Sequence, residues 1–177
     1  MELLGTITGI EITGHPPVKM PSYVREAVRA VLFRPNLIAL LNVSAHGYHK
    51  LPGGGIEENE IRLDALSREI MEETGWKVDV LGEVGGIIEL RDEENMEQHS
   101  YCYLARATKK VSGPMFTDLE IRQGFELEWI RMDNALEVFD NDEPDNIVGR
   151  YINLRDSIFL KKGIELIMDG LSSQKKY

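Results

Sequence analysis

The chain has 177 residues, of which 42% are hydrophobic, and a formal net charge of −10 at pH 7. This length and composition are sufficient for a sizeable core, so we expect residues 1–177 to form one domain. The negative charge argues against binding to nucleic acid polymers, because such binding depends on Lys and Arg side chains that neutralise phosphates.

The N-terminal part of the chain contains three predicted strands. Residues 3–13 alternate weakly between apolar and polar types, which indicates a short strand. Residues 23–33 fit either a helix or a strand, and their Val content with interspersed Arg favours a strand of a mixed sheet. Leu37–Val43 is a continuous apolar run bounded by turn residues, which predicts a buried strand. The turn residues at 34–36 predict that the last two strands form a hairpin.

The C-terminal part alternates predicted strands with loops and ends in a long helix. Gly85 and Gly86 lie inside the strand-like run 78–89 and predict a bulge there. Thr117, followed by acidic residues, indicates a helix start, and Asp133 is expected to cap a later short helix. The other elements, in chain order, are a charged loop at 91–98, a return strand at 100–108, a loop-like segment at 109–123, an alternating strand at 125–131, a short helix at 134–139 and a helix at 147–171 that breaks near Gly163.

Residues 53–76 join a glycine-rich turn to a helix that ends in acidic residues. Glycines permit positive φ angles and a close approach of the backbone to a ligand. With 3.6 residues per turn, Glu69, Glu72 and Glu73 fall within an arc of about 100° on the helical wheel. Like charges on one face repel, and a hard divalent cation that prefers oxygen ligands removes that repulsion. The pattern therefore predicts a site for Mg²⁺ or Mn²⁺.

The same helix has an apolar side and recognisable ends. Leu63, Leu66 and Ile70 occupy an arc next to the acidic one and are expected to anchor the helix to a sheet. Gly75 is predicted to end the helix in the left-handed conformation. Glu60 is out of phase with the acidic arc, so we expect it to support the loop rather than to bind metal.

This stretch resembles the signature of a known family. Gly54, then Glu60 after five residues, then the run Arg68–Trp76 after seven more resemble a complete Nudix box, the motif of the Nudix (MutT-like) hydrolases. The resemblance implies an α/β fold, namely the Nudix α/β/α sandwich with a mixed central sheet and flanking helices. It covers about residues 22–140 and leaves residues 1–21 and 141–177 unexplained.

The resemblance also implies which residues carry the chemistry. The implied catalytic residues are Arg68, Glu69, Glu72 and Glu73. The three glutamates would hold Mg²⁺ or Mn²⁺, with the backbone carbonyl of Gly53 as a further ligand. Family members often add a glutamate from outside the box. Glu120, Glu126 and Glu128 qualify by position, and Glu120 and Glu126 are the preferred candidates. Either Glu69 or Glu72 would act as the general base, and Arg68 is placed to orient Glu72 across one helical turn.

Substrate contacts are less well specified by the sequence. Lys50, Gly54 and Gly55 lie at the glycine turn and are candidates for phosphate binding. His46 and His49 precede this turn, where an ordinary loop role is the simpler interpretation. Further candidates for phosphate or base recognition, among which the spacing makes no choice, are Arg25, Arg29, Arg91 and Arg106, and the aromatic candidates for stacking are Tyr48 and Trp129.

The resemblance implies a divalent-metal-dependent pyrophosphohydrolase that cleaves a phosphoanhydride of a nucleoside diphosphate linked to another moiety. The alternatives are a non-hydrolytic ligand-binding or sensor domain of the same fold, and an isoprenoid diphosphate isomerase. The isomerase reading expects a cysteine before the box, whereas Cys102 follows it and is expected to be a buried thiol. The start lacks a basic leader and no apolar run reaches the ~18 residues of a membrane span, so we expect a cytoplasmic protein without membrane binding. The last helix carries enough apolar residues to make a homodimer conceivable.

Overall fold

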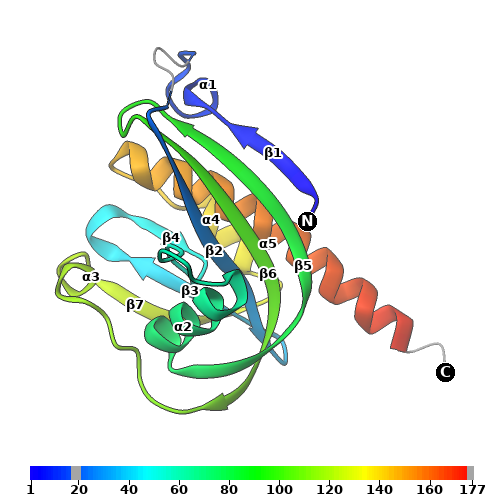
Figure 1. The fold of residues 1–177 in the computed structure, drawn as a ribbon. Coiled ribbons are helices and arrows are strands. Elements are labelled where there is room, and N and C mark those ends of the chain that lie inside the picture. The colour runs from blue at the N-terminus through cyan, green and yellow to red at the C-terminus, as the bar shows by residue number, and fades with distance from the viewer. Residues whose placement is uncertain (17–20, 175–177) are drawn as a thin grey trace.

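The computed structural model describes residues 1–16 and 21–174, which form a mixed sheet between two helical layers (Figure 1). The strands follow the order β1-β5-β6-β2-β3-β4, with β7 paired to β3. The predicted α/β/α sandwich is confirmed. The described elements are β1 (Leu3–Ile7), α1 (Gly9–Thr13), β2 (Tyr23–Arg34), β3 (Leu37–Val43), a 3₁₀ turn (Ser44–His46), β4 (Tyr48–Lys50), α2 (Arg62–Thr74), β5 (Trp76–Arg91), β6 (Met96–Lys110), α3 (Asp118–Arg122), β7 (Phe125–Arg131), α4 (Ala135–Asp140) and α5 (Ile147–Gln174).

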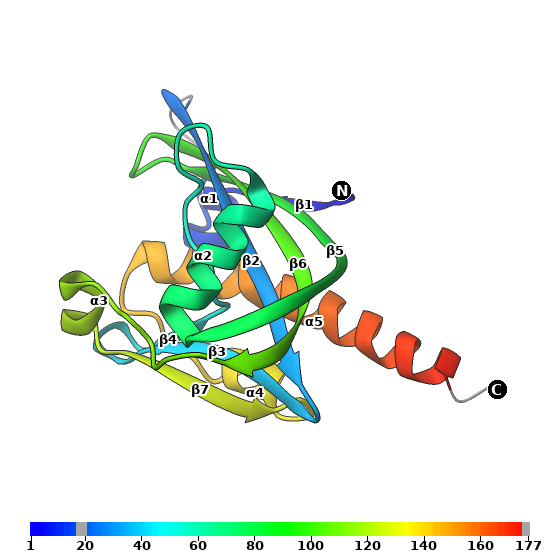
Figure 2. The same ribbon diagram turned by 60° about the horizontal axis from the view of Figure 1, so that its bottom comes forward.

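The pairing of β2 leaves room for the glycine turn. Along its length β2 runs parallel to β6, whereas its antiparallel pairing with β3 is limited to two residue pairs, Phe33 with Ile38 and Arg34 with Leu37. The predicted hairpin is therefore present, but its strands diverge after two pairs, and β3 continues beside β7 (Figure 2). Because β2 and β3 separate, one edge of β2 is free to bind the segment that follows β4.

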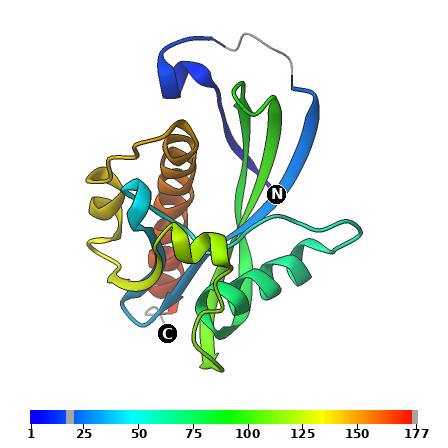
Figure 3. The same cartoon turned by 90° about the vertical axis from the view of Figure 1, so that its left-hand side faces the viewer.

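Helices lie on both faces of the sheet (Figure 3), and a hydrophobic core lies on each face. The core under α2 contains Val28, Leu32, Leu66 and Ile70, and the core under α4 and α5 contains residues such as Val31. Neighbouring residues of β2 thus face opposite layers, as the two-residue period of a strand requires. The two cores share one sheet. The expectation of one domain for residues 1–177 stays a prediction. None of the helices in residues 1–16 and 21–174 has both the length and the apolar composition needed to cross a membrane.

Three predictions about where helices and strands begin, end or break are wrong. The strand expected over residues 3–13 ends at Ile7, because Thr8 and Glu11 form a capping box that starts α1. Asp133 does not cap α4, since its carboxylate binds the guanidinium of Arg131 instead. The last helix does not break at Gly163. A Cβ on that glycine would lie 2.6 Å from a Val31 methyl group, so the glycine lets α5 pack closely on β2.

Two further differences concern charged and apolar side chains. The loop expected over residues 91–98 is a short turn between β5 and β6, and Arg91 and Gln98 at its ends are buried within the strands. Leu63 does not anchor α2, because it lies on the solvent side with 45% of its surface exposed, while Leu66 and Ile70 are fully buried as predicted. The bulge near Gly85 and the left-handed Gly75 at the end of α2 agree with the predictions.

Candidate active site

The glycine turn is held against the free edge of β2. Val28 N–H donates to the carbonyl of Gly54, and Ala30 N–H donates to the carbonyl of Pro52; both hydrogen bonds have a length of 2.9 Å. Gly53 has a φ of +133°, and a Cβ there would lie 2.2 Å from the Val28 oxygen. Only glycine combines this backbone conformation with so close an approach. The turn is thus a fixed extension of the sheet, and it presents its other side to α2.

The end of α2 brings its acidic face against this turn. Leu66 and Ile70 pack into the core, which directs Glu69 toward Gly54. A Cβ on Gly54 would lie only 2.3 Å from a carboxylate oxygen of Glu69. Glu69 is largely covered, with 14% of its side chain exposed, whereas Glu72 is 45% exposed. The box therefore places one carboxylate against the turn and another in solvent.

Arg68 ties the loop before α2 to the carboxylates on it. Its guanidinium binds both carboxylate oxygens of Glu60, at 2.8 and 2.9 Å, and the carbonyl of Gly55 at 3.1 Å. The same group donates to Glu69 at 2.9 Å and to Glu72 at 3.3 Å. Hydrogen bonds from Arg68 and from the Glu57 N–H lower the pKa of Glu60 to about 2. Glu60 is thus a support for the loop, as the sequence indicated.

Glu73 lies behind the turn with both oxygens engaged. Its carboxylate accepts from Lys50 Nζ at 2.8 Å and from Gly53 N–H at 2.6 Å, and only 3% of the residue is exposed. Burial raises the pKa of Glu73, while Lys50 opposes that rise. Lys50 is therefore a counter-ion of Glu73, and it also lies 5.0 Å from the ring centre of Phe125.

The carboxylates of α2 line one hollow of about 460 Å³, which we call the acidic hollow. It is bounded by Glu69, Glu72, Glu73, Met115, Thr117 and Glu120. Glu120 reaches it from the start of α3, where its carboxylate also accepts from Thr117. Glu126 is not part of it. This second candidate lines a separate, aromatic pocket together with Arg34, Trp76 and Trp129.

The donor set of the acidic hollow suits a hard divalent cation. Four carboxylates on one surface are the oxygen ligands that Mg²⁺ and Mn²⁺ prefer. The ligand sphere is not assembled, however, since no three acidic, His or Cys side chains among the described residues meet at metal-binding distances. Glu73 in particular would have to exchange its bond to Lys50 for one to a cation. The residues therefore fit the metal in their chemistry, and binding it requires side-chain rearrangement.

Several other candidates from the sequence lie outside the acidic hollow. His46 and His49 bind Asp145 and Asp142 of the segment before α5, at 3.0 and 2.7 Å, which is a structural role. Tyr48 is buried against α5, where a Cβ on Gly149 would lie 2.8 Å from its ring. Trp129 has the Arg34 guanidinium 4.4 Å from its ring centre.

Two more candidates are separated from the turn. Arg106 is exposed on β6 and pairs with Asp79 at 2.8 Å. Cys102 is fully buried, and burial raises the pKa of its thiol, so its thiolate is not available at neutral pH.

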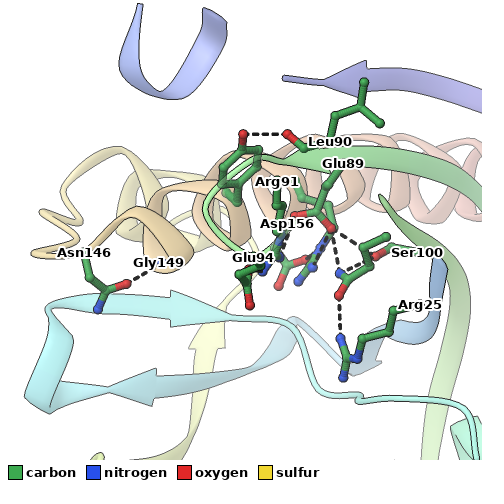
Figure 4. A network of polar contacts seen from close by, with 12 residues as sticks. Arg25, Glu89, Leu90, Arg91, Glu94, Ser100, Asn146, Gly149 and Asp156 are labelled. Atoms are coloured by element: carbon green, nitrogen blue, oxygen red, sulfur yellow. Dashed lines mark hydrogen bonds and ion pairs between the residues drawn. The ribbon is translucent and has the colours of Figure 1, made fainter. Parts of the chain in front are cut away.

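The sequence reasoning missed a polar network on the α5 side of the turn (Figure 4). Asp156 of α5 accepts from Leu51 N–H at 2.8 Å and from Arg155 Nε at 2.7 Å. The turn is thus held from both sides, by Glu73 on the α2 side and by Asp156 on the α5 side. The signal in the sequence that could have indicated such a role is the adjacent pair Arg155 and Asp156, because the other residues of 151–160 are mostly apolar.

Comparison with known proteins assigns this arrangement to a family. A family model described as NUDIX domain matches residues 24–149. A curated relative, diphosphoinositol polyphosphate phosphohydrolase 2 of Rattus norvegicus, is 27% identical over 96 residues, which are 53% of this chain and 49% of the relative. The chain spans about half the length of the curated relatives it matches.

Solved structures share the fold at low sequence identity. A NUDIX hydrolase from Nitrosomonas europaea superposes with a TM-score of 0.56 at 16% identity, covering 74% of this chain and 88% of that one. A UDP-X diphosphatase gives the same TM-score of 0.56 at 18% identity, and the superposition covers 84% of this chain and 66% of the diphosphatase chain. The fold, the glycine turn and the acidic helix define a sandwich of the Nudix class. Because the family model matches well over half of its 177 residues, this chain belongs to the NUDIX domain family.

Proposed function

We propose that this chain is a divalent-metal-dependent pyrophosphohydrolase, which cleaves a phosphoanhydride of a nucleoside diphosphate linked to another moiety. The observation that carries the proposal is the acidic hollow. There three box glutamates and Glu120 line one surface beside a glycine turn that is held on both sides. Water attacks a phosphoanhydride slowly, because the anhydride is anionic and water is a weak nucleophile. A site for this reaction must therefore supply cations and a base.

In this proposal Glu69, Glu72 and Glu73 hold Mg²⁺ or Mn²⁺, with the Gly53 carbonyl and Glu120 as further donors. A bound divalent cation lowers the pKa of water and neutralises phosphoryl oxygens. Arg68 keeps Glu69 and Glu72 oriented through its hydrogen bonds at 2.9 and 3.3 Å, and either of these carboxylates is placed to accept the proton of the attacking water. Lys50, released from Glu73, is free to bind a phosphate oxygen beside Gly54 and Gly55.

The names of the relatives bear on the substrate class. They specify a diphosphoinositol polyphosphate and UDP-X, both of which contain a phosphoanhydride. We therefore propose a small anhydride substrate of nucleotide type, rather than a nucleic acid polymer. A cytoplasmic location is a separate proposal, on which these names do not bear. The apolar residues of α5, including Tyr151, Phe159 and Leu160, pack on the sheet, and this packing is the alternative to an interface between two copies of the helix. A homodimer through α5 is therefore only a secondary part of the proposal.

The alternative functions have less support. An isomerase of the same fold needs a reactive cysteine, and Cys102 is fully buried within β6. A sensor domain that has lost catalysis would be expected to lack a box glutamate, and all three are present.

The proposal is tested by measuring phosphate release from a panel of nucleotide and inositol diphosphate substrates, with and without a coupling phosphatase. Turnover is expected with Mg²⁺ or Mn²⁺ and should vanish in excess chelator. Glu72→Gln should lose this turnover, and Glu165→Gln is its matched control, because Glu165 is an exposed glutamate on α5, away from the acidic hollow. Full turnover in chelator would exclude the metal mechanism.

A further inference from the structure

A second pocket, of about 540 Å³, lies between the start of β5 and β7, and we call it the aromatic pocket. Its volume is within the ~300–1,000 Å³ that is typical of sites for small molecules. Four partly buried rings line it, namely Trp76, Phe116, Phe125 and Trp129. They form two edge-to-face pairs, Trp76 with Trp129 at 5.6 Å and Phe116 with Phe125 at 5.8 Å between ring centres. The pocket therefore has the size and the lining of a site for a small planar molecule.

Three charged side chains of the aromatic pocket have no ion-pair partner within residues 1–16 and 21–174. The Arg34 guanidinium lies 4.4 Å from the ring centre of Trp129 and 5.6 Å from that of Trp76. Its buried Nε has no hydrogen-bond partner in the same part of the chain. Glu126 and Lys110 line the pocket as well, and both are exposed. A guanidinium only donates hydrogen bonds and an ionised carboxylate only accepts them, so the pocket offers both to a ligand.

The aromatic pocket and the acidic hollow share one wall. In the segment before α3, Pro114 and Phe116 line the aromatic pocket, whereas Met115 and Thr117 line the acidic hollow. The Met115 N–H donates to the carbonyl of Glu72 at 2.6 Å, which holds this segment against the end of α2 (Figure 1). A ligand that occupies both places has to cross only this segment.

We propose that the aromatic pocket binds the nucleobase of the substrate while the phosphates lie in the acidic hollow. This inference rests on the proposed function and deepens it, since the ribose between base and phosphates would cross the shared wall. Every nucleobase has a π face that stacks favourably on aromatic side chains. An inositol polyphosphate has no such face and carries many phosphates, whereas the pocket has two cations and one carboxylate. The substrate class is therefore a nucleotide derivative rather than an inositol diphosphate.

The polar groups of the aromatic pocket match guanine better than the other common bases. Guanine has two neighbouring acceptors, O6 and N7, which a guanidinium such as that of Arg34 binds through two parallel hydrogen bonds. It also has two neighbouring donors, N1–H and the amino group, which suit the two oxygens of the Glu126 carboxylate. Adenine, cytosine and uracil each lack one of these pairs. We therefore expect guanine nucleotides to bind most tightly.

Tryptophan fluorescence reports on the aromatic pocket, because both tryptophans of the chain line it. The probe is guanosine 5′-monophosphate in excess chelator, and ribose 5-phosphate is the matched ligand that lacks only the base. Saturable quenching is expected with guanosine 5′-monophosphate and not with ribose 5-phosphate. The absence of saturable quenching by any of the four common mononucleotides would exclude the pocket as a base site. Tighter binding of another mononucleotide would overturn the contacts assigned to Arg34 and Glu126.

Three variants keep both tryptophans and test the pocket directly. Phe116→Ala and Arg34→Met should each weaken the binding of guanosine 5′-monophosphate about tenfold or more, as the loss of a stacking or charged contact predicts. Glu126→Gln should weaken it more than it weakens the binding of the other mononucleotides. Glu165→Gln and Arg106→Met are the controls, because both residues are exposed and lie outside the pocket. Wild-type affinity in Phe116→Ala and Arg34→Met would exclude the proposal. Should Arg34→Met fail to fold, Phe116→Ala decides, because it changes a loop residue.

Steady-state kinetics separate recognition of the base from support of the fold. With the best nucleotide substrate of the panel, Phe116→Ala should raise KM about tenfold or more. Inorganic tripolyphosphate has phosphoanhydrides and no base, so it should inhibit the wild type and Phe116→Ala with the same inhibition constant. An equal loss of affinity for the nucleotide and for tripolyphosphate would show that Phe116 only supports the acidic hollow, and would overturn the proposal.

The same measurements distinguish a failure of this inference from a failure of the proposed function. Quenching that requires the base and is weakened in Phe116→Ala, without hydrolysis of any substrate of the panel, would remove the proposed function and keep the nucleotide site. Hydrolysis with the same KM in the wild type and Phe116→Ala, and without quenching that requires the base, would keep the proposed function and remove the site.

Discussion

Replacing Gly54 by alanine is a direct test of the contact between the glycine turn and α2. The ideal Cβ at this position lies 2.3 Å from a Glu69 carboxylate oxygen, whereas ordinary van der Waals contact begins at 3.4 Å. The carboxylate must therefore retreat by 3.4 − 2.3 = 1.1 Å. Because Glu69 meets the turn with the flexible end of its side chain, we expect the fold to absorb the change. A misplacement of ~1 Å at a reacting group costs on the order of 10²-fold in rate.

The measurements are kcat with saturating Mg²⁺ and the melting temperature. Gly54→Ala should lose about two orders of magnitude in kcat and remain folded. Gly82→Ala is the control, since nothing lies within 4 Å of a Cβ there, and both quantities should stay close to the wild type. Gly53→Ala should instead lose stability, because its Cβ meets the Val28 backbone oxygen at 2.2 Å and its φ is +133°. Wild-type kcat in Gly54→Ala would refute the role given to the position of Glu69.

The remaining predictions concern the chemistry, the acid stability and the assembly. Glu72→Gln should lower kcat by orders of magnitude without unfolding the protein, because an amide lacks the charge of the carboxylate ligand. Cys102→Ser should stay active. An inactive but folded Cys102→Ser would indicate a thiol mechanism. With saturating Mg²⁺, kcat should rise from about pH 6 to about pH 9, since the attacking water must lose a proton, and a maximum near about pH 5 would require a different base. The pKa of Glu60 in the folded state is lowered from 4.5 to about 2. The ionised Glu60 therefore stabilises the folded state at a pH above 4.5, and this contribution is lost as the pH falls from 4.5 to about 2. Glu60→Gln should therefore have a lower melting temperature than the wild type at neutral pH, and the difference between the two melting temperatures should decrease in acid. A difference that does not depend on pH would contradict the role given to the ionised Glu60. Sedimentation at high micromolar concentration should reveal a dimer if α5 forms an interface, and a strict monomer would exclude it.

The parts of the site that depend on local spacing could be predicted from the sequence. The i, i+3 and i+4 positions of Glu69, Glu72 and Glu73 require only helical geometry, and Gly75 could be expected to end α2 because its conformation suits glycine. The alternation in β7 likewise predicted a strand at Phe125–Arg131, with the same bounds in the structure. In each case the physical cause lies within a few residues of the chain.

Only the tertiary structure decided which distant groups meet at the turn. Glu120 and Glu126 are close in sequence, but only Glu120, at the start of α3, borders the acidic hollow. Lys50 and Glu73 pair because the divergence of β2 from β3 lets the turn fill the gap under α2. Asp156 reaches Leu51 from a helix 105 residues further along the chain. Such partners are selected by which faces of sheet and helix pack together, and local periodicity has no information on that packing.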